Sequence, residues 1–403
     1  VSSAAFHGPL DPELPPMSVA PDAPAEAVAR IAKLIKTAQR PVLLAGHGVL
    51  IANAHTELRQ VAAAFDIPVV TTLLGKGAMD ETQPLALGML GMHGTAYANK
   101  AVLESDLLIN VGSRFDDRIT GDIQTFAQGK TVVHVDIDAS EIGKMIRPDI
   151  AVRADARAFL SALLATKVTT SHSEWHQHLN GYRKKYPLSY DDSLGLTQQH
   201  VLDAINIATR GQAVMTTDVG QHQMWAAQFY RVKQANHWIS SGGAGTMGFG
   251  LPSALGAQFA CPGKPVVAIV GDGGFQMTLY ELATAMIHKL PVKIFVMNNH
   301  YLGMVRQWQE LFYDNRLSGV DLEGNPDFVK LAESYGMKAL NLESPDDVTA
   351  TVANAFAYPG PVLINCEVAK TDNVYPMIPA GRAYDAMLTE APTTKLEKPM
   401  GST

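Results

Sequence analysis

Cysteine is nearly absent from this chain, which has only Cys261 and Cys366 among its 403 residues. Two cysteines are too few for a disulfide scaffold or a thiolate metal cluster. The chain also lacks an apolar run close to the roughly 20 residues that a membrane-spanning helix needs. Its start lacks the charged segment and apolar stretch of a secretory signal peptide. Basic residues are outnumbered, with 32 Lys and Arg against 39 Asp and Glu, and the formal net charge is −7. We therefore predict a cytoplasmic protein, or a plastid one without its transit peptide, with no membrane or nucleic-acid partner.

What is present is an ordinary globular composition in two alternating helix–strand series. Hydrophobic residues make up 47% of the chain and charged residues 18%, which is typical of a folded protein with enough apolar material for more than one core. We predict an α/β fold with two domains, each with a central, mainly parallel sheet flanked by helices. The predicted parts are a linker or remnant at 1–24, a first domain at 25–167, a linker at 168–195, a second domain at 196–371 and a C-terminal arm at 372–403.

Short apolar runs rich in β-branched residues predict the strands, because strands of parallel sheets are buried on both faces. In the first domain we expect strands at Pro41–Ala45, Ile67–Thr71, Leu107–Val111 and Thr131–Ile137, with helices at Ala25–Thr37 and Asn53–Phe65. In the second domain we expect strands at Ala213–Thr217, Val266–Val270, Val292–Met297 and Val362–Asn365.

One strand–helix–strand segment carries the most information. A buried strand delivers Gly271-Asp272-Gly273 to its end, a helix follows, and the next strand ends at Asn298-Asn299. Asp272 and Asn299 are 27 residues apart, the length of one such crossover. Both side chains should therefore emerge at the same edge of the sheet, where open α/β sheets bind ligands. The helix between them is expected to bury one stripe, made of Leu279, Leu282, Ala283 and Met286.

These groups suit a hard cation. Mg²⁺ prefers six oxygen ligands and usually takes one or two carboxylates together with phosphate oxygens. Asp272 offers a carboxylate, Asn299 an amide oxygen, and Tyr301 a backbone carbonyl just beyond. The alternative is that each segment is only a turn, which explains either segment alone but not the pair at this spacing. The sequence therefore predicts a magnesium and diphosphate site.

The same pair resembles the signature of thiamine-diphosphate enzymes, in which Gly-Asp-Gly is followed by Asn-Asn at the end of the next strand. Other segments resemble the acetolactate synthase family of these enzymes, and the resemblance runs from about Pro41 to Gly381. It implies decarboxylation of pyruvate on thiamine diphosphate and condensation of the hydroxyethyl unit with pyruvate or 2-oxobutyrate, for valine, leucine and isoleucine biosynthesis. The segments that carry it are 88–94, 112–118, 218–225, 241–252 and 302–313.

The resemblance also assigns roles at the thiamine site. The diphosphate would lie on backbone N–H groups at a helix start, the Gly245 carbonyl would accept a hydrogen bond from the aminopyrimidine, and Met247 would keep the cofactor bent. A core methionine is the plainer reading of Met247 taken alone. The residues implied around thiamine diphosphate are Val219, Gly220, Gln221, His222, Gly245, Met247, Gly271, Asp272, Gly273, Gly274, Asn299 and Tyr301, with Asp272, Asn299 and Tyr301 on the metal.

A second group of residues is implied around substrate and a structural FAD. The resemblance places Met304 and Trp308 at the pocket for the second 2-oxo acid, with Trp308 favouring 2-oxobutyrate, although their spacing also suits a core stripe. It pairs Arg118 with a substrate carboxylate, for which a planar guanidinium is suited. The catalytic set is thus Met247, Arg118, Trp308 and Met304. The residues implied around FAD, each of which could instead be an ordinary turn or strand end, are Gly46, Gly48, Thr72, Leu73, Gly91, Met92, His93, Gly112, Arg114, Asp116, Arg118, Asp136, Asp155 and Ala156.

An NAD-dependent dehydrogenase is the alternative from another class. The run Gly243–Gly248 satisfies the dinucleotide fingerprint Gly-x-Gly-x-x-Gly, and an acid follows at Asp272. However, the preceding stretch 236–241 is a poor strand, and Asp272 lies 29 residues past Gly243 where the fingerprint expects about 20. This reading also leaves Asn298 and Asn299 without a role.

The resemblance further implies an N-terminal domain whose glutamate activates the cofactor, since the thiazolium carbon needs a positioned base. Before Pro41 the only glutamates are Glu13 and Glu26, and neither ends an apolar strand. The chain would then be inactive or weakly active alone, be completed by a separate chain, or be a non-catalytic cofactor-binding remnant. The implied partners are pyruvate, 2-oxobutyrate, further copies in a homo-oligomer, and a small regulatory subunit.

Overall fold

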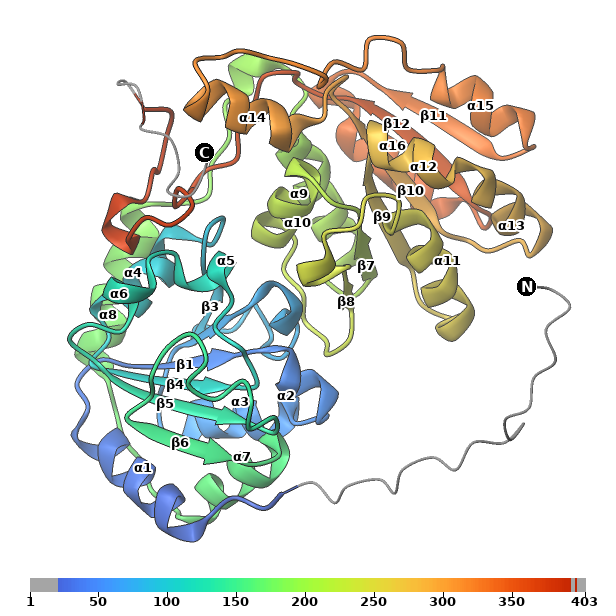
Figure 1. Ribbon diagram of the computed structural model, residues 1–403. Helices are drawn as coiled ribbons and strands as arrows, with labels where there is room; N and C mark the ends of the chain where they lie inside the picture. The colour runs from blue at the N-terminus through green and yellow to red at the C-terminus, as the bar shows by residue number, and fades with distance from the viewer. Residues whose placement is uncertain (1–20, 393–395, 397–403) are drawn as a thin grey trace, which may run out of the picture.

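The computed structural model describes residues 21–392 and residue 396. Most of the linker predicted at 1–24 and the end of the arm predicted at 372–403 therefore lie outside the described residues. Two open sheets of six strands each form the centres of two helix-covered units (Figure 1). The pairs within both sheets are parallel, which confirms the predicted α/β class. In the described ranges, no helix is long and apolar enough to cross a bilayer.

The first sheet has the strand order β3-β2-β1-β4-β5-β6. Its central strands β1 and β4 are buried along their whole length, as expected where helices cover both faces. The strands are β1 Pro41–Ala45, β2 Val69–Thr71, β3 Ala86–Met89, β4 Leu107–Val111, β5 Thr131–Asp136 and β6 Ile150–Arg153. The helices of this unit are α1 Ala25–Thr37, α2 His47–Ile51, α3 His55–Ala64, α4 Ala96–Glu104, α5 Asp117–Thr120, α6 Ile123–Phe126, α7 Ala156–Ala165 and α8 Ser173–Lys185, with the 3₁₀ turn η1 at Leu73–Gly75.

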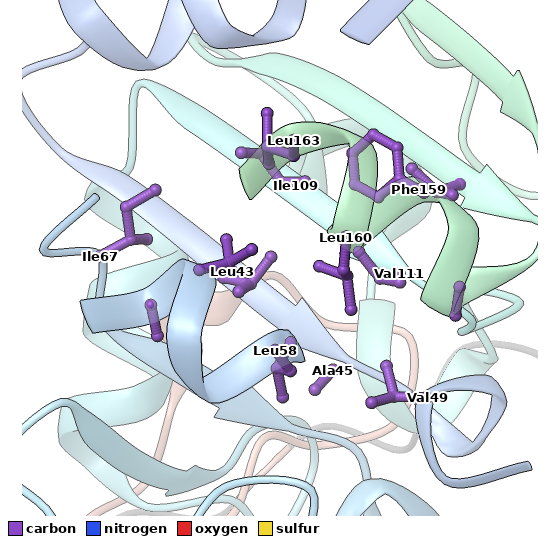
Figure 2. Close-up of a cluster of buried hydrophobic side chains, with 14 of the residues drawn as sticks. Leu43, Ala45, Val49, Leu58, Ile67, Ile109, Val111, Phe159, Leu160 and Leu163 are labelled. Carbon is purple, nitrogen blue, oxygen red and sulfur yellow. The ribbon is translucent and has the colours of Figure 1, made fainter. Parts of the chain in front are cut away.

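One face of the first sheet packs on a hydrophobic cluster (Figure 2). Successive strand side chains alternate between faces, so alternate residues of β1 and β4 enter this cluster. α1 contributes Val28, Ile31 and Ile35, which share one helical stripe. Burial of each large side chain stabilises the fold by about 1.5–3 kcal/mol. The members labelled in Figure 2 are Leu43, Ala45, Val49, Leu58, Ile67, Ile109, Val111, Phe159, Leu160 and Leu163.

The second sheet has the order β11-β12-β10-β9-β7-β8. Its strands are β7 Val214–Thr217, β8 Trp238–Ile239, β9 Val266–Gly271, β10 Lys293–Asn298, β11 Lys338–Leu342 and β12 Val362–Glu367. Its helices are α9 Gln198–Thr209, α10 Gln221–Phe229, α11 Gly250–Ala260, α12 Asp272–Thr278, α13 Leu282–Ile287, α14 Gly303–Phe312, α15 Phe328–Ser334 and α16 Val348–Ala357. Short 3₁₀ turns lie at η2 Asp192–Leu194, η3 Gly242–Ala244, η4 Leu279–Glu281, η5 Pro345–Asp347 and η6 Tyr384–Ala386.

All eight predicted strands are confirmed, with ends shifted by at most two residues. The four strands that the sequence did not predict are β3, β6, β8 and β11, which are the edge strands of the two sheets. Edge strands commonly bury less surface, and two of these four do so. β6 alternates between buried and exposed residues, and four of the five residues of β11 are not fully buried.

Two expectations about helices were wrong in detail. The segment 168–195 was expected to be only a linker, but it contains α8, whose Trp175 and Leu179 are buried against the first unit. The Trp175 Nε1 donates to the carbonyl of Pro41 at 3.2 Å. The helix expected after Asp272 is broken into α12, η4 and α13. Its fully buried positions in α13 are Leu282 and Ala285, whereas Leu279, Ala283 and Met286 are partly exposed.

The C-terminal arm returns from the second unit to the first (Figure 1). Near its start, the Val374 N–H donates to the Gln307 side chain at 2.9 Å. Further along, the Ile378 N–H donates to the Met92 carbonyl at 2.8 Å. Tyr384 is buried and its hydroxyl donates to the Ile119 carbonyl. The arm therefore connects α14 of the second unit with the loops at one edge of the first sheet.

Candidate active site

Asp272 and Asn299 lie at the same edge of the second sheet. Strands β9 and β10 are parallel neighbours, with Gly271 paired to Met297. Asp272 follows β9 directly and Asn299 follows β10, so both lie past the carboxyl ends of adjacent strands. Both side chains are buried, with 2% and 4% exposed. This is the edge at which parallel sheets hold ligands.

Asp272 is held by neutral donors. Its Oδ2 accepts from Asn325 Nδ2 at 2.8 Å, and its Oδ1 accepts from the Gly273 N–H at 3.0 Å. Burial raises the pKa of the Asp272 carboxyl to about 6, while the hydrogen bond from Asn325 acts in the opposite direction. Among the described residues there is no group of three or more His, Cys, Asp and Glu side chains that could hold a metal ion. A cation on Asp272 would therefore take most of its oxygen ligands from amides, carbonyls and a bound ligand.

The two consecutive asparagines have different partners. Asn298 donates to Glu367 at 2.9 Å and accepts from Asn325 at 3.1 Å. Asn299 Oδ1 accepts from the Tyr301 N–H at 3.2 Å, and its Nδ2 lies 3.5 Å from the Gln221 Oε1. The hydrogen bonds of Asn298 thus stabilise the edge of the sheet, whereas Asn299 faces the start of α10.

The start of α10 brings Gly220, Gln221 and His222 to this edge. His222 is 6% exposed, and its Nε2 is buried with no hydrogen-bond partner in the described part of the chain. Burial lowers the pKa of His222 to about 4, so its imidazole is neutral at neutral pH. A Cβ atom on Gly220 or on Gly271 would lie 2.9 Å from the His222 ring. A side chain at either position would therefore force the His222 ring to shift, and Gly220 also has a φ of +150°, which favours glycine.

Met247 reaches the same edge from the loop before α11. Its Cε lies 3.6 Å from the position that a Cβ of Gly273 would take. Gly245 adopts a left-handed conformation with a φ of +57° and is exposed. The strand before this loop, β8, has two residues and lies at the edge of the sheet. The dehydrogenase alternative needs a buried strand there and receives no support.

α14 carries Met304 and Trp308 and is fixed by a bridge of two glutamines. Gln221 Nε2 donates to Gln307 Oε1 at 2.9 Å and to the carbonyl of Asp372 in the arm at 2.9 Å. A Cβ on Gly303 would lie 2.1 Å from the Gln221 Oε1, so a side chain at this position would force the Gln221 amide to move. Trp308 is partly exposed and packs edge-on against Phe312, with ring centroids 5.4 Å apart. The structure therefore joins α14, the arm and the start of α10.

The glycines expected at FAD bring two loops of the first sheet together. The Gly48 N–H donates to the Gly112 carbonyl at 3.0 Å. A Cβ on Gly46 would lie 2.1 Å from that carbonyl oxygen, and one on Gly48 would lie 2.7 Å from the Gly112 Cα. Both loops follow the carboxyl ends of adjacent strands, β1 and β4. The backbone contact alone explains these glycines, and a bound dinucleotide would lie at the same edge.

The loop of Gly91, Met92 and His93 contacts the short helix α5 at Arg118. The Met92 N–H donates to the Arg118 carbonyl at 2.8 Å, and a Cβ on Gly91 would lie 2.3 Å from the same oxygen. Burial lowers the pKa of His93 to about 4. The Arg118 side chain is 61% exposed, with Asp117 at 3.5 Å. Its guanidinium therefore remains accessible to a ligand.

The remaining first-unit candidates have local structural partners. Arg114 pairs with Asp116, and the Arg114 Nη2 lies 3.0 Å from the position of a Cβ on Gly243. Asp155 caps α7 by accepting from the Arg157 and Ala158 N–H groups. Thr72 caps η1, which begins at Leu73. Asp136 accepts a hydrogen bond from the Asp138 N–H. Ala156 is the first residue of α7. These contacts fit the interpretation of these residues as parts of ordinary turns and strand ends. Their contact with FAD stays a prediction.

Sequence reasoning missed Asn325, Gln307 and Glu367. Asn325 lies 53 residues past Asp272 in the loop between α14 and α15, where no periodic pattern distinguishes it from other loop residues. Gln307 is fully buried between Met304 and Trp308. Gln307 follows Met304 by three residues and so shares its side of the helix. An amide at such a position is a signal that could have found it, because buried amides need partners.

Comparison with known proteins gives two matches to family models. Residues 28–163 match the thiamine pyrophosphate enzyme central domain, and residues 218–366 match the thiamine pyrophosphate enzyme C-terminal TPP binding domain.

The chain is 45% identical over 370 residues to the acetolactate synthase large subunit of Cyanidium caldarium, covering 90% of this chain and 63% of that one. It is 46% identical over 375 residues to the corresponding large subunit of Parasynechococcus marenigrum, covering 91% and 60%. It is 43% identical over 356 residues to that of Lactococcus lactis, covering 88% and 62%. The chain thus spans about three fifths of the length of the curated relatives it matches.

Proposed function

This chain belongs to the thiamine pyrophosphate enzyme family, whose central and C-terminal domains it contains, and from this premise we propose that it binds thiamine pyrophosphate (thiamine diphosphate) with Mg²⁺ and acts in acetolactate synthesis. The proposed reaction joins two molecules of pyruvate into acetolactate with loss of CO₂, or joins pyruvate to 2-oxobutyrate. The observation that carries the proposal is the shared sheet edge at which Asp272, Asn299, His222 and Met247 converge.

The residues at this edge suit a magnesium diphosphate. The His222 Nε2 is a buried polar atom without a hydrogen-bond partner among the described residues, and such atoms are normally satisfied by a ligand or water. The only carboxylate proposed for the metal is Asp272, which suits an ion that takes its other ligands from phosphate oxygens. Asn299 and the Tyr301 carbonyl complete the proposed protein ligands. Val219, Gly220, Gln221 and the glycines 271, 273 and 274 would surround the diphosphate.

The chain's own residues would orient the ligands and exclude water. Thiamine diphosphate, when bound, supplies the carbanion chemistry that decarboxylation of a 2-oxo acid requires. Met247 would support its bent conformation from below, and the Gly245 carbonyl would accept from its aminopyrimidine. Arg118 would bind the carboxylate of the second 2-oxo acid, because its guanidinium is exposed and forms bidentate pairs.

FAD, further copies of the chain and a small regulatory subunit are also part of the proposal. FAD would lie at the carboxyl edge of the first sheet, where the loops that follow β1 and β4 meet. The relatives are named as large subunits, which supports a smaller partner. The dehydrogenase and the non-catalytic remnant are not favoured.

Calorimetry of the purified chain tests the binding half of the proposal. We expect thiamine diphosphate to bind with Mg²⁺ present and not after chelation of the metal, because the diphosphate and Asp272 are both anionic without it. Thiamine monophosphate is the matched ligand control, since it offers fewer phosphate oxygens to the metal. Equal binding with and without Mg²⁺ would refute the proposed metal site.

A second test concerns acceptor choice. Trp308→Leu is expected to reduce the preference for 2-oxobutyrate over pyruvate by about 10-fold, within the 10–200-fold range that apolar pocket contacts supply for one methylene. The measurement is the ratio of acetohydroxybutyrate to acetolactate formed from mixed substrates. It uses an assembly of the chain that is active on pyruvate. Phe312→Leu is the control, because Phe312 is 2% exposed and packs on Trp308 from the side of the core. An unchanged product ratio in Trp308→Leu would remove Trp308 from the pocket.

A further inference from the structure

A fully buried carboxylate, Asp218, lies at the end of β7 beside the proposed cofactor site. Its exposed fraction is 0%. Its Oδ1 accepts from the Val219 N–H at 2.9 Å and from the Gly248 N–H at 3.0 Å, and its Oδ2 accepts from the Gly250 N–H at 2.8 Å. Of these donors, Gly248 belongs to the loop that carries Met247, and Gly250 is the first residue of α11, which follows that loop. The carboxylate therefore ties this loop to the end of a central strand.

The same carboxylate also contacts the first turn after Asp272. A Cβ on Gly274 would lie 2.3 Å from the Asp218 Oδ1, and one on Gly250 would lie 2.8 Å from the Asp218 backbone nitrogen. Asp218 thus fills the space between the strand end, the loop before α11 and the start of α12. No substitution at Gly274 can be accommodated unless the carboxylate moves away from its donors.

We infer that Asp218 is a positioning residue, which fixes the loop at 245–249 and the start of α11 so that Met247 lies over Gly273, where the cofactor would bend. This inference rests on the proposed function. Met247 is adjacent to Gly248, so the hydrogen bond to Asp218 is one residue away from the side chain that it positions. The Gly248 backbone has a φ of +86°, a conformation in which glycine is not strained. The loop is therefore held by the carboxylate and by its own glycine.

The chemistry of the three donors requires a carboxylate. Both oxygens of an ionised Asp accept hydrogen bonds, whereas an Asn has one accepting oxygen and one donating NH₂ group. In Asp218→Asn, either the Gly250 N–H or the pair of N–H groups from Val219 and Gly248 would face another donor. A buried donor left without an acceptor costs far more than an exposed one. The loop would move to relieve this contact.

The test compares two ligands that use different parts of the site. Thiamine diphosphate with Mg²⁺ would contact both the metal edge and the loop, whereas inorganic pyrophosphate with Mg²⁺ would contact the metal edge alone. In Asp218→Asn we expect the affinity for thiamine diphosphate to fall by about 10-fold or more, with the affinity for magnesium pyrophosphate changed by less than about 3-fold. We also expect a weaker near-ultraviolet circular dichroism signal of the bound cofactor at saturation. The control is Asp106→Asn, since Asp106 likewise accepts from two backbone N–H groups, those of Gln39 and Arg40, in the first unit.

Equal loss of both ligands in Asp218→Asn would overturn the inference while leaving the proposed function intact. Failure of the unaltered chain to bind either ligand would overturn the proposed function and the inference with it. If Asp218→Asn does not fold, Gly250→Ala carries the test, because its Cβ would lie 2.8 Å from the Asp218 backbone nitrogen and 3.0 Å from the Asp218 Cβ, and Gly250 is not among the residues proposed around the diphosphate. Undiminished thiamine diphosphate binding by Gly250→Ala would then refute the positioning role.

Discussion

Asp272→Ala is expected to abolish Mg²⁺-dependent binding of thiamine diphosphate. Asp272 is the only carboxylate proposed for the metal, and the described residues contain no cluster of acids or histidines that could replace it. Removal of residues that merely support a metal ligand typically costs 10–100-fold in affinity. We therefore expect the loss of a ligand itself to exceed about 100-fold, as measured by calorimetry at fixed Mg²⁺.

Removal of the Asp272 charge alone should not destabilise the chain without ligand. Asp272 is 2% exposed, and its neutral donors Asn325 and Gly273 only partly replace the water that an ionised carboxylate loses. Asp272→Asn keeps the volume and removes the charge, so its thermal midpoint without ligand should equal or exceed that of the unaltered chain. Added thiamine diphosphate and Mg²⁺ should then raise the midpoint of the unaltered chain but not of Asp272→Asn. A cofactor-induced rise of equal size in both proteins would exclude Asp272 as a ligand.

The sheet edge could be predicted from the sequence because it depends on rules that act along the chain. Continuous apolar runs identify central strands, and one crossover places the ends of β9 and β10 at one edge. The edge strands could not be predicted in this way, since β6 and β11 are only half buried. For Asp272 and Asn299 the sequence therefore predicted the location of the two side chains, and their role as ligands stays a prediction.

The partners of those residues could not be predicted, because they depend on contacts between distant loops. Asn325 reaches Asp272 from a loop 53 residues away, and Asp372 of the arm reaches Gln221 across 151 residues. No periodicity in the sequence encodes such pairs. The carboxylate of Asp218 was part of a segment that resembles the family, but its three backbone donors became evident only in the fold.

Lys76→Met is expected to destabilise the fold by about 3–5 kcal/mol, the usual cost of removing one partner of a buried ion pair. The side chains of Lys76 and Glu81 are 1% and 6% exposed. The Lys76 Nζ donates to both carboxylate oxygens of Glu81, at 2.6 and 2.7 Å, and to the Ala227 carbonyl of α10 at 2.8 Å. Glu81 in turn accepts from the Val232 N–H at 2.8 Å. The pair therefore joins a loop of the first unit to the chain at and beyond α10, and Lys76→Met would leave a carboxylate buried between the two units.

A double-mutant cycle separates the pair from its surroundings. Glu81→Gln keeps an acceptor for Val232 but leaves the ammonium of Lys76 buried without a charged partner, so it should also be strongly destabilising. Lys76→Met combined with Glu81→Gln removes both charges, and we expect it to be less destabilised than the sum of the single variants by at least about 2 kcal/mol, within the range of couplings between contacting residues. The measurement is urea denaturation followed by fluorescence and circular dichroism. Additive losses would mean that the two charges do not stabilise each other. Lys76 would then act mainly through the Ala227 carbonyl and the face of Trp238, whose ring centroid lies 5.2 Å from the Nζ.

α10 begins at the proposed diphosphate site and ends beside this pair. The loss of the pair should therefore also lower the affinity for thiamine diphosphate, although no residue of the pair belongs to that site.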